Sequence, residues 1–218
     1  MSIFFGGDKA EALSLGPNLV YEVWVGDQLI FPQAEELRYA YGHIVDRNVG
    51  YKTARIPWWA RTVHMFALGA GGGGAGGDGA IVRWGMPGKP GAVKHVALTR
   101  EPKDGDEINM QFHPPGLGAE PNKTGFRGGS TIIEYPGGIL TAEGGAGGTG
   151  FSITESSPEP PGTLSAEGTD YVFGYNVASA VGYPNAGFGG RGGRGGIFGA
   201  AKSGEDGRAG AAALVFLP

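Results

Sequence analysis

Short apolar runs, separated by glycine, proline and polar residues, recur along the whole chain. They are rich in the β-branched and aromatic residues that favour strands, and no segment keeps the period of an amphipathic helix. The predicted strands are 13–15, 19–25, 29–31, 62–68, 93–99, 107–112, 131–135, 139–142, 171–175 and 211–217. Many short strands joined by glycine turns predict an all-β protein, a short-strand β-sandwich with glycine-rich loops.

The pattern divides the chain into three parts. Residues 1–32 form a small N-terminal β-meander, with turns at Gly16-Pro17-Asn18 and Gly26-Asp27-Gln28 and a stop at Pro32. Residues 33–55 are polar and mixed, and we interpret them as a linker with a short helix over 34–41. Residues 56–218 are the glycine-rich β domain.

Glycine use changes this picture of residues 56–218. The chain has 45 glycines in 218 residues, and 6 of them fall before residue 69, which leaves 39 for the rest. Aromatic residues at 11% and a net charge of only -4 argue against disorder. Fixing each glycine costs roughly 1 kcal/mol, which packing must offset. Polyglycine II helices, packed side by side with amides paired between neighbours, would do so.

Several classes are excluded or disfavoured by composition. No apolar run approaches the length of a membrane-spanning helix, and the first residues do not have the pattern of a signal peptide. We therefore expect no membrane insertion. The chain has no cysteine, which removes disulfides and thiolate metal sites. Its mild acidity disfavours nucleic acid as a bulk partner.

Glycine-rich motifs that resemble phosphate or calcium sites lack the required context. The strand 63–68 runs into Gly69-Ala70-Gly71-Gly72-Gly73-Gly74, a dinucleotide-binding spacing, but no helix pattern follows. Residues 196–203 differ from a phosphate-binding loop at Ala201, and no buried strand precedes them. Residues 73–78 fit a single calcium nonapeptide, a motif that works in stacked arrays. We expect no cofactor and no metal.

Catalytic chemistry has no anchor in the sequence. His43, His64, His95 and His113 show no ligand spacing, and no G-x-S-x-G or cysteine supplies a nucleophile. The paired carboxylates Glu35-Glu36 and Asp104/Asp106 come without any sign of a cleft. A non-enzymatic role is expected.

The segment Arg191-Gly192-Gly193-Arg194-Gly195-Gly196 resembles an RGG element. Such elements bind nucleic acid through flexible arginines, and an RGG-type nucleic-acid binder stays open as an alternative function. With two arginines in an acidic chain, we favour a structural loop whose arginines bond neighbouring carbonyls or an acidic partner.

Residues 56–218 resemble the glycine-rich domain of bacteriophage minor tail proteins. The resemblance rests on the strand 56–68 running into 69–79, and on Gly128-Gly129-Ser130-Thr131-Ile132-Ile133, with 136–148 and 207–217 following in the same order. The N-terminal Leu13-Ser14-Leu15-Gly16 and Val23 to Phe31 pattern is similar to a hairpin module at the start of such proteins.

This resemblance implies a structural component of a phage tail tip, made in the host cytoplasm and located in the virion. Its partners would be other tail proteins, and three-fold tail symmetry suggests a homotrimer. The chain is also similar to polyglycine-helix adhesins. A host-surface receptor-binding adhesin that recognises a cell-wall glycan is therefore the first alternative. Aromatic residues stack on sugar faces, and the candidates for glycan contact are Trp58, Trp59, Trp84, Tyr183 and Phe188.

Overall fold

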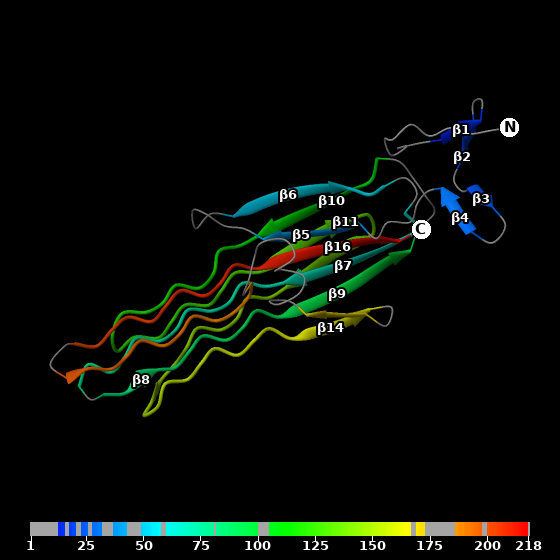
Figure 1. The fold of residues 1–218 in the computed structure, drawn as a ribbon. Coiled ribbons are helices and arrows are strands. Elements are labelled where there is room, and N and C mark those ends of the chain that lie inside the picture. The colour runs from blue at the N-terminus through cyan, green and yellow to red at the C-terminus, as the bar shows by residue number, and fades with distance from the viewer. Residues whose placement is uncertain are drawn as a thin grey trace.

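The computed structural model shows an all-β chain without a described α-helix (Figure 1). It describes residues 13–15, 18–20, 23–25, 28–31, 37–42, 49–57, 60–80, 82–99, 105–166, 169–172, 186–197 and 200–217. The strands are β1 (Leu13–Leu15), β2 (Asn18–Val20), β3 (Val23–Val25), β4 (Gln28–Phe31), β5 (Leu37–Gly42), β6 (Gly50–Arg55), β7 (Thr62–Leu68), β8 (Trp84–Gly85), β9 (Val93–Thr99), β10 (Glu107–Phe112), β11 (Thr131–Tyr135), β12 (Gly138–Ala142), β13 (Phe151–Ser152), β14 (Thr163–Ala166), β15 (Thr169–Val172) and β16 (Ala211–Leu217).

Two antiparallel sheets of four strands form the sandwich. Their orders are β5-β16-β7-β9 and β12-β11-β10-β6. β7 and β16 lie in the middle of the first sheet, and six of the seven residues of each strand are buried, so both of their faces are covered. The strand β10 instead alternates exposed and buried residues, as expected for a sheet with one face in solvent. The hairpins β1-β2, β3-β4 and β14-β15 are separate two-stranded sheets.

The core lies between the two sheets. Met65 and Leu214 from the first sheet pack with Met110, Phe112 and Ile133 from the second, and all are fully buried. The hydroxyl of Thr131, also buried, donates to the carbonyl of Leu68 at 2.7 Å and so joins the sheets where β7 ends. A second cluster, on the other face of β7 and β16, contains Phe66 and Val215.

The predicted all-β class is confirmed, and so are most of the expected strands. The run 19–25 proves to be two strands, β2 and β3, with residues 21–22 outside the described part. The hydrophobic pattern did not reveal β5, β6, β8, β13 or β14.

The helix predicted over 34–41 is wrong in its described part, because Leu37–Gly42 is β5. This segment pairs along β16, which gives its backbone amides inter-strand partners. Tertiary pairing therefore decides a segment whose local propensity is weak. β6 also lies within the segment 33–55, and it pairs with β10.

Beyond one end of the sandwich, the glycine-rich segments extend as a bundle of undulating chains (Figure 1). The central segment, 69–78, continues from β7 and is buried along its whole length. The segments around it are 83–92, 187–196, 202–209, 114–122, 123–129 and 143–150, in the order in which neighbours hydrogen-bond to one another in a closed ring. This is a hexagonal packing of one chain segment within six.

Hydrogen bonds run between these segments with a period of three. Gly72 and Ala75 both donate to the segment 83–92, at 3.0 and 2.9 Å, and the intervening amides donate to 123–129 and 202–209. These acceptor segments are antiparallel to the centre. The parallel segments 114–122, 143–150 and 187–196 donate to its carbonyls. A three-residue turn without internal hydrogen bonds is the polyproline II geometry, so the described bundle has the hydrogen-bond pattern of packed polyglycine II helices, which the sequence left open.

Close approach of backbones explains the glycines. A Cβ on Gly73 would overlap the carbonyl of Leu117, and one on Gly76 would overlap that of Glu120. Because the neighbouring atoms are backbone atoms held on several sides, they have no room to move. The bundle therefore requires glycine wherever a residue points at a neighbouring segment.

Candidate functional site

The bundle has two different ends. At one end its segments continue into the strands of the sandwich, and at the other they are joined by short loops, near β8 and β13 (Figure 1). The loops carry side chains that the packed glycine segments cannot. Binding groups are therefore expected at this distal end and on the adjacent surface of the bundle.

Asp78 closes the distal end of the central segment. The residue is 4% exposed, and its carboxylate accepts hydrogen bonds from the amide of Ala80 at 2.8 Å and from Nε of Arg83 at 2.8 Å. A second guanidinium nitrogen of Arg83 also contacts it. The backbone amide of Asp78 donates to the carbonyl of Arg83 at 3.1 Å, so side chain and main chain fix the same turn.

Large apolar side chains are exposed around this end. Val82 is 49% exposed, Phe151 38%, Ile153 84% and Ile197 52%. Their loops meet there, because β8 pairs with β13 and the amide of Gly196 donates to the carbonyl of Asp78. Clustered exposed apolar groups are a feature of interaction surfaces.

Two arginines lie over aromatic rings at the same end. The guanidinium of Arg83 is 5.2 Å from the ring centre of Phe151, and that of Arg194 is 6.0 Å from the ring of Trp84. These distances are within the range of cation–π attraction. The distal end therefore combines apolar, aromatic and cationic groups.

A tight turn at residues 120–123 lies beside this end. The amide of Lys123 donates to the carbonyl of Glu120 at 3.1 Å, with Pro121 next and Asn122 at a φ of 63°. Proline followed by a residue of positive φ is the pattern of a type II turn. Asn122 anchors the turn to the central segment, since its amide donates to the carbonyl of Gly77 and its side-chain oxygen accepts the amide of Gly79 at 2.9 Å.

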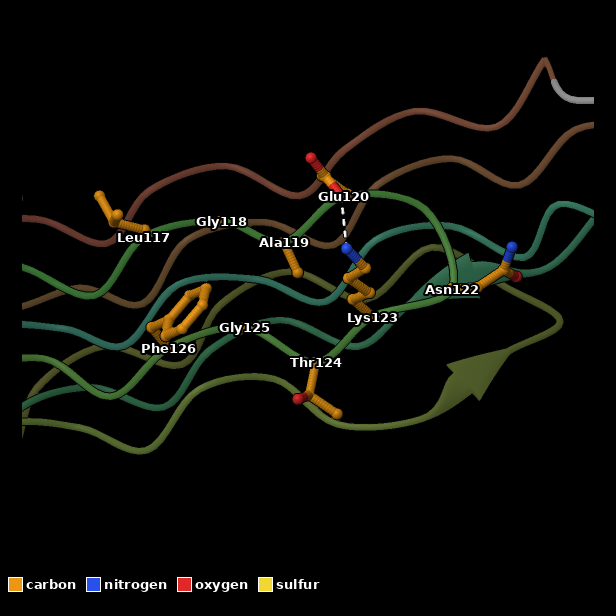
Figure 2. Close-up of a pocket in the computed structure, with 9 residues that line it drawn as sticks. All are labelled: Leu117, Gly118, Ala119, Glu120, Asn122, Lys123, Thr124, Gly125 and Phe126. Atoms are coloured by element: carbon orange, nitrogen blue, oxygen red, sulfur yellow. Dashed lines mark hydrogen bonds and ion pairs between the residues drawn. The ribbon is translucent and has the colours of Figure 1, made fainter.

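A shallow trough of about 700 Å³ begins at this turn and runs along the bundle surface (Figure 2). It lies between the antiparallel segments 114–122 and 123–129. Its lining residues are Leu117, Gly118, Ala119, Glu120, Asn122, Lys123, Thr124, Gly125 and Phe126. Phe126 is 62% exposed, and Lys123 Nζ and Glu120 form an ion pair at 2.6 Å. This ion pair lowers the pKa of Glu120.

The glycan-contact candidates from the sequence are not brought together by the described structure. Trp58, Trp59 and Tyr183 lie outside the described residues. Trp84 is at the distal end, whereas Phe188 lies near the sandwich, beside the hydrogen bond between Gly91 and Gly187. Their role in glycan contact stays a prediction.

The dinucleotide-like spacing lies in the central segment. All backbone amides from Gly69 to Asp78 donate to carbonyls of neighbouring segments, so none can bind a pyrophosphate. The RGG-like arginines, Arg191 and Arg194, lie in the ordered segment 187–196. In the parts of the chain that the structure describes, no three His, Cys, Asp or Glu residues gather as metal ligands.

A family described as "Glycine-rich domain" matches residues 47–215. The chain belongs to the glycine-rich domain family. The match spans most of the chain and covers the polyglycine bundle, β6 and almost all of β16, whereas β5, an edge strand of the first sheet, lies before its first residue. No curated protein matches this chain. Among the described residues, no helix has the length and apolar character needed to cross a bilayer.

The sequence of this glycine-rich domain contains a second pattern, separate from the apolar runs that predict strands, and this pattern indicates the bundle. Glycines repeat every third residue in its ring segments, as at 85, 88 and 91, at 189, 192 and 195, and at 204, 207 and 210. Since a polyglycine II helix has three residues per turn, such a row faces one neighbour. The trough residues Leu117 and Phe126 carry no comparable signal in the sequence, and only the structure places them together.

Proposed function

We propose that the protein is a non-enzymatic structural subunit of a bacteriophage tail tip, with the polyglycine bundle projecting from the particle. The observation that carries this proposal is the central segment, whose amides are all paired and whose length is buried. The resemblance of residues 56–218 to glycine-rich domains of minor tail proteins supports it. In this role the protein would reach the virion from the host cytoplasm.

The bundle suits the task of a rigid spacer. Each residue of the central segment donates its amide to one surrounding segment, and most of its carbonyls accept from another, which leaves little freedom for bending. At about 3.1 Å per residue, a segment such as 69–78 spans roughly 30 Å. Such a spacer would hold the distal loops away from the sandwich, while residues 1–32 would attach to another tail protein by β-pairing and a trimer would match the tail symmetry.

Immunogold labelling of intact particles tests this role. An antibody raised against the purified chain should label the tail tip, and mass spectrometry of purified virions should contain its peptides. Absence of both from the particles would refute the proposal. Antibody binding to the free chain provides the control that the epitopes are accessible.

A second candidate is a host-surface adhesin, favoured by one observation at the distal end. Exposed Ile153 and Val82, together with the Arg83–Phe151 and Arg194–Trp84 pairs, give the apolar and aromatic composition of a recognition surface. In an adhesin this end would contact a cell-surface glycan. The same antibody should then block adsorption of particles to host cells, and normal adsorption with a labelled tip would leave the structural role alone.

A further inference from the structure

The exposed aliphatic side chains of the distal end come from three separate loops. Val82 lies just before β8, Ile153 directly follows β13, and Ile197 follows the ring segment 187–196 (Figure 1). With Phe151 they make up four of the seven large hydrophobic side chains that are exposed in the described residues, and Ile153, at 84%, is the most exposed of the seven. Such a concentration at one end of the molecule indicates a contact surface.

The hydrogen bonds show how far out these side chains lie. The last residue of the central segment is Asp78, whose amide donates to Arg83 and whose carbonyl accepts the amide of Gly196. Val82 and Ile197 adjoin these two partners on the side of the connecting loops. They therefore lie beyond the last hydrogen-bonded level of the bundle, where no glycine segment covers them.

Aromatic and cationic side chains lie at and just behind this level. Lys202 is level with Gly77, whose amide donates to its carbonyl at 2.9 Å, and the amide of Lys202 donates to the carbonyl of Arg194 at 2.8 Å. The guanidinium of Arg194 in turn lies over the ring of Trp84. Along the bundle axis, the order from the tip inward is therefore aliphatic groups, then aromatic and cationic groups, then glycine backbone.

This order is that of a bilayer surface met from the water side. Aliphatic groups enter the acyl chains, tryptophan favours the interfacial region, and cations remain at the level of the headgroups. A fluid interface also accommodates side chains from separate loops, whereas a protein partner must match a broad surface of about 800 Å². The arrangement therefore favours lipid as the partner of this end.

The charges at this end give a modest preference for anionic lipid. Its cations are Arg83, Arg194 and Lys202, and its carboxylates are Asp78, buried against Arg83, and Glu155, exposed two residues after Ile153. Three cations against two carboxylates leave one positive charge. Attraction to an anionic surface is therefore a secondary contribution, and apolar contact carries the binding.

We propose that the distal end binds the interface of a lipid bilayer, with Val82, Ile153 and Ile197 among the outer parts of the acyl chains. Trp84 and Lys202 lie at the level of the headgroups in this complex. The contact is confined to side chains of three loops and needs no segment that crosses the bilayer. This binding activity goes beyond the tail-tip role and does not depend on it.

Co-sedimentation of the purified full chain with lipid vesicles tests the proposal. We expect binding to phosphatidylcholine vesicles and a few-fold tighter binding to an equimolar mixture with phosphatidylglycerol. Ile153→Asp should lower the affinity about tenfold or more, because it replaces an inserted aliphatic group by a charge. Ile139→Asp is the matched control, since Ile139 is 65% exposed on β12 in the sandwich, and it should leave the affinity unchanged.

A fluorescent label locates the contact. The chain has no cysteine, so Ile153→Cys can carry a single environment-sensitive dye. Its emission should shift to shorter wavelength when vesicles are added, and the same dye on Ile139→Cys should not respond. Because both side chains are exposed, thermal unfolding of all four variants should match that of the parent and exclude misfolding as the cause.

Three results would each overturn the proposal: no binding to either kind of vesicle, equal loss of binding in Ile153→Asp and Ile139→Asp, or a dye at position 153 that responds to soluble cell-wall polysaccharide and not to vesicles. The last result would assign the distal end to the adhesin role instead. Failure with vesicles leaves the tail-tip role intact, because immunogold labelling of particles tests that role separately. Unlabelled particles, in turn, would not remove binding measured on the purified chain.

Discussion

At the scale of single residues, the bundle depends on glycine, because a side-chain Cβ would not fit between its segments. Gly73 lies in the central segment, and a Cβ there would overlap the backbone carbonyl of Leu117. Gly162, by contrast, is not enclosed, since its added Cβ would meet only a side-chain methyl of Val93 at 3.8 Å. The same substitution should therefore have opposite effects at these two positions.

Gly73→Ala should lower the free energy of unfolding by about 3 kcal/mol or more, because overpacking against fixed backbone cannot relax. Gly162→Ala should be neutral or stabilising by up to about 1 kcal/mol, since it reduces the freedom of the unfolded chain. Chemical denaturation of both variants measures the difference. Equal stabilities would contradict the close packing of the central segment.

A pair of histidines gives the first sheet a pH-dependent feature. His64 Nδ1 lies 3.0 Å from His95 Nε2, and their rings stack, with Phe66 next to His95 at 4.5 Å between ring centres. Burial, and to a smaller extent the charge of His64, lower the pKa of His95 below its ordinary 6.5. The folded state therefore disfavours protonated His95.

We expect stability that is complete above about pH 6.5 and falls as the pH drops below it, because the unfolded chain then binds more protons. The change should be modest, since His95 is only partly buried. Thermal unfolding at about pH 7.5 and 5.5 measures it. His95→Gln should reduce the drop, and His113→Gln, outside this pair, should not. An equal drop in both variants would assign the effect to other groups.

At the scale of elements, the central segment is a helix that makes no hydrogen bonds of its own. Its amides reach out to three antiparallel neighbours, and its distal end is closed by the buried carboxylate of Asp78 with Arg83. A β-strand has partners in one plane, whereas this segment has them all around. If the contact between Asp78 and Arg83 is broken, the segments that meet at this end should therefore lose their alignment together.

Asp78→Asn keeps an oxygen for the amide of Ala80 but removes the charge that holds Arg83. We expect a loss of about 1–3 kcal/mol, below the value for a fully buried pair because the Arg83 side chain is 41% exposed. Glu159→Gln, in the exposed pair with Lys89 at 3.1 Å, should cost no more than about 1 kcal/mol. Denaturant midpoints of the two variants measure both losses of stability. Equal losses would show that the buried Asp78–Arg83 pair stabilises the protein no more than the exposed Lys89–Glu159 pair.

At the scale of the whole molecule, a sandwich with an apolar core continues directly into a bundle with a backbone core. The join is direct: β7 runs into the central segment and Thr131 bonds to Leu68 beside it. In the sandwich, burial of large side chains such as Phe112 and Phe216 supplies the stability. In the bundle, paired amides and close backbone contacts must supply it.

Hydrogen exchange should therefore be slowest in two places, β7 with β16 and the central segment 70–77. Amides of the central segment are both hydrogen-bonded and buried, and they can exchange only when the ring opens. The exposed turn around Asn122 and the distal loops should exchange far sooner. Mass-spectrometric exchange on the intact chain measures this, and rapid exchange of residues 70–77 would show that the bundle is not rigid.

The sequence by itself determined the all-β class and the strands β7, β9, β10, β11, β12 and β16, because apolar runs of strand length bounded by glycine or proline are a local signal. It also determined that the glycine tracts must pack closely or not fold at all. For the candidate site it supplied Trp84 and Phe188, which the fold keeps apart, and it missed Phe126.

Only the tertiary structure decided which segment lies at the centre and which six surround it. It also decided that β5 is an edge strand of the first sheet and β6 an edge strand of the second. The physical reason is that a polyglycine II helix has no internal hydrogen bonds, so its partners are set by the whole packing and not by its own sequence. The trough has the same origin: Leu117 and Phe126 are distant from any local motif and become neighbours only because the segments 114–122 and 123–129 are paired.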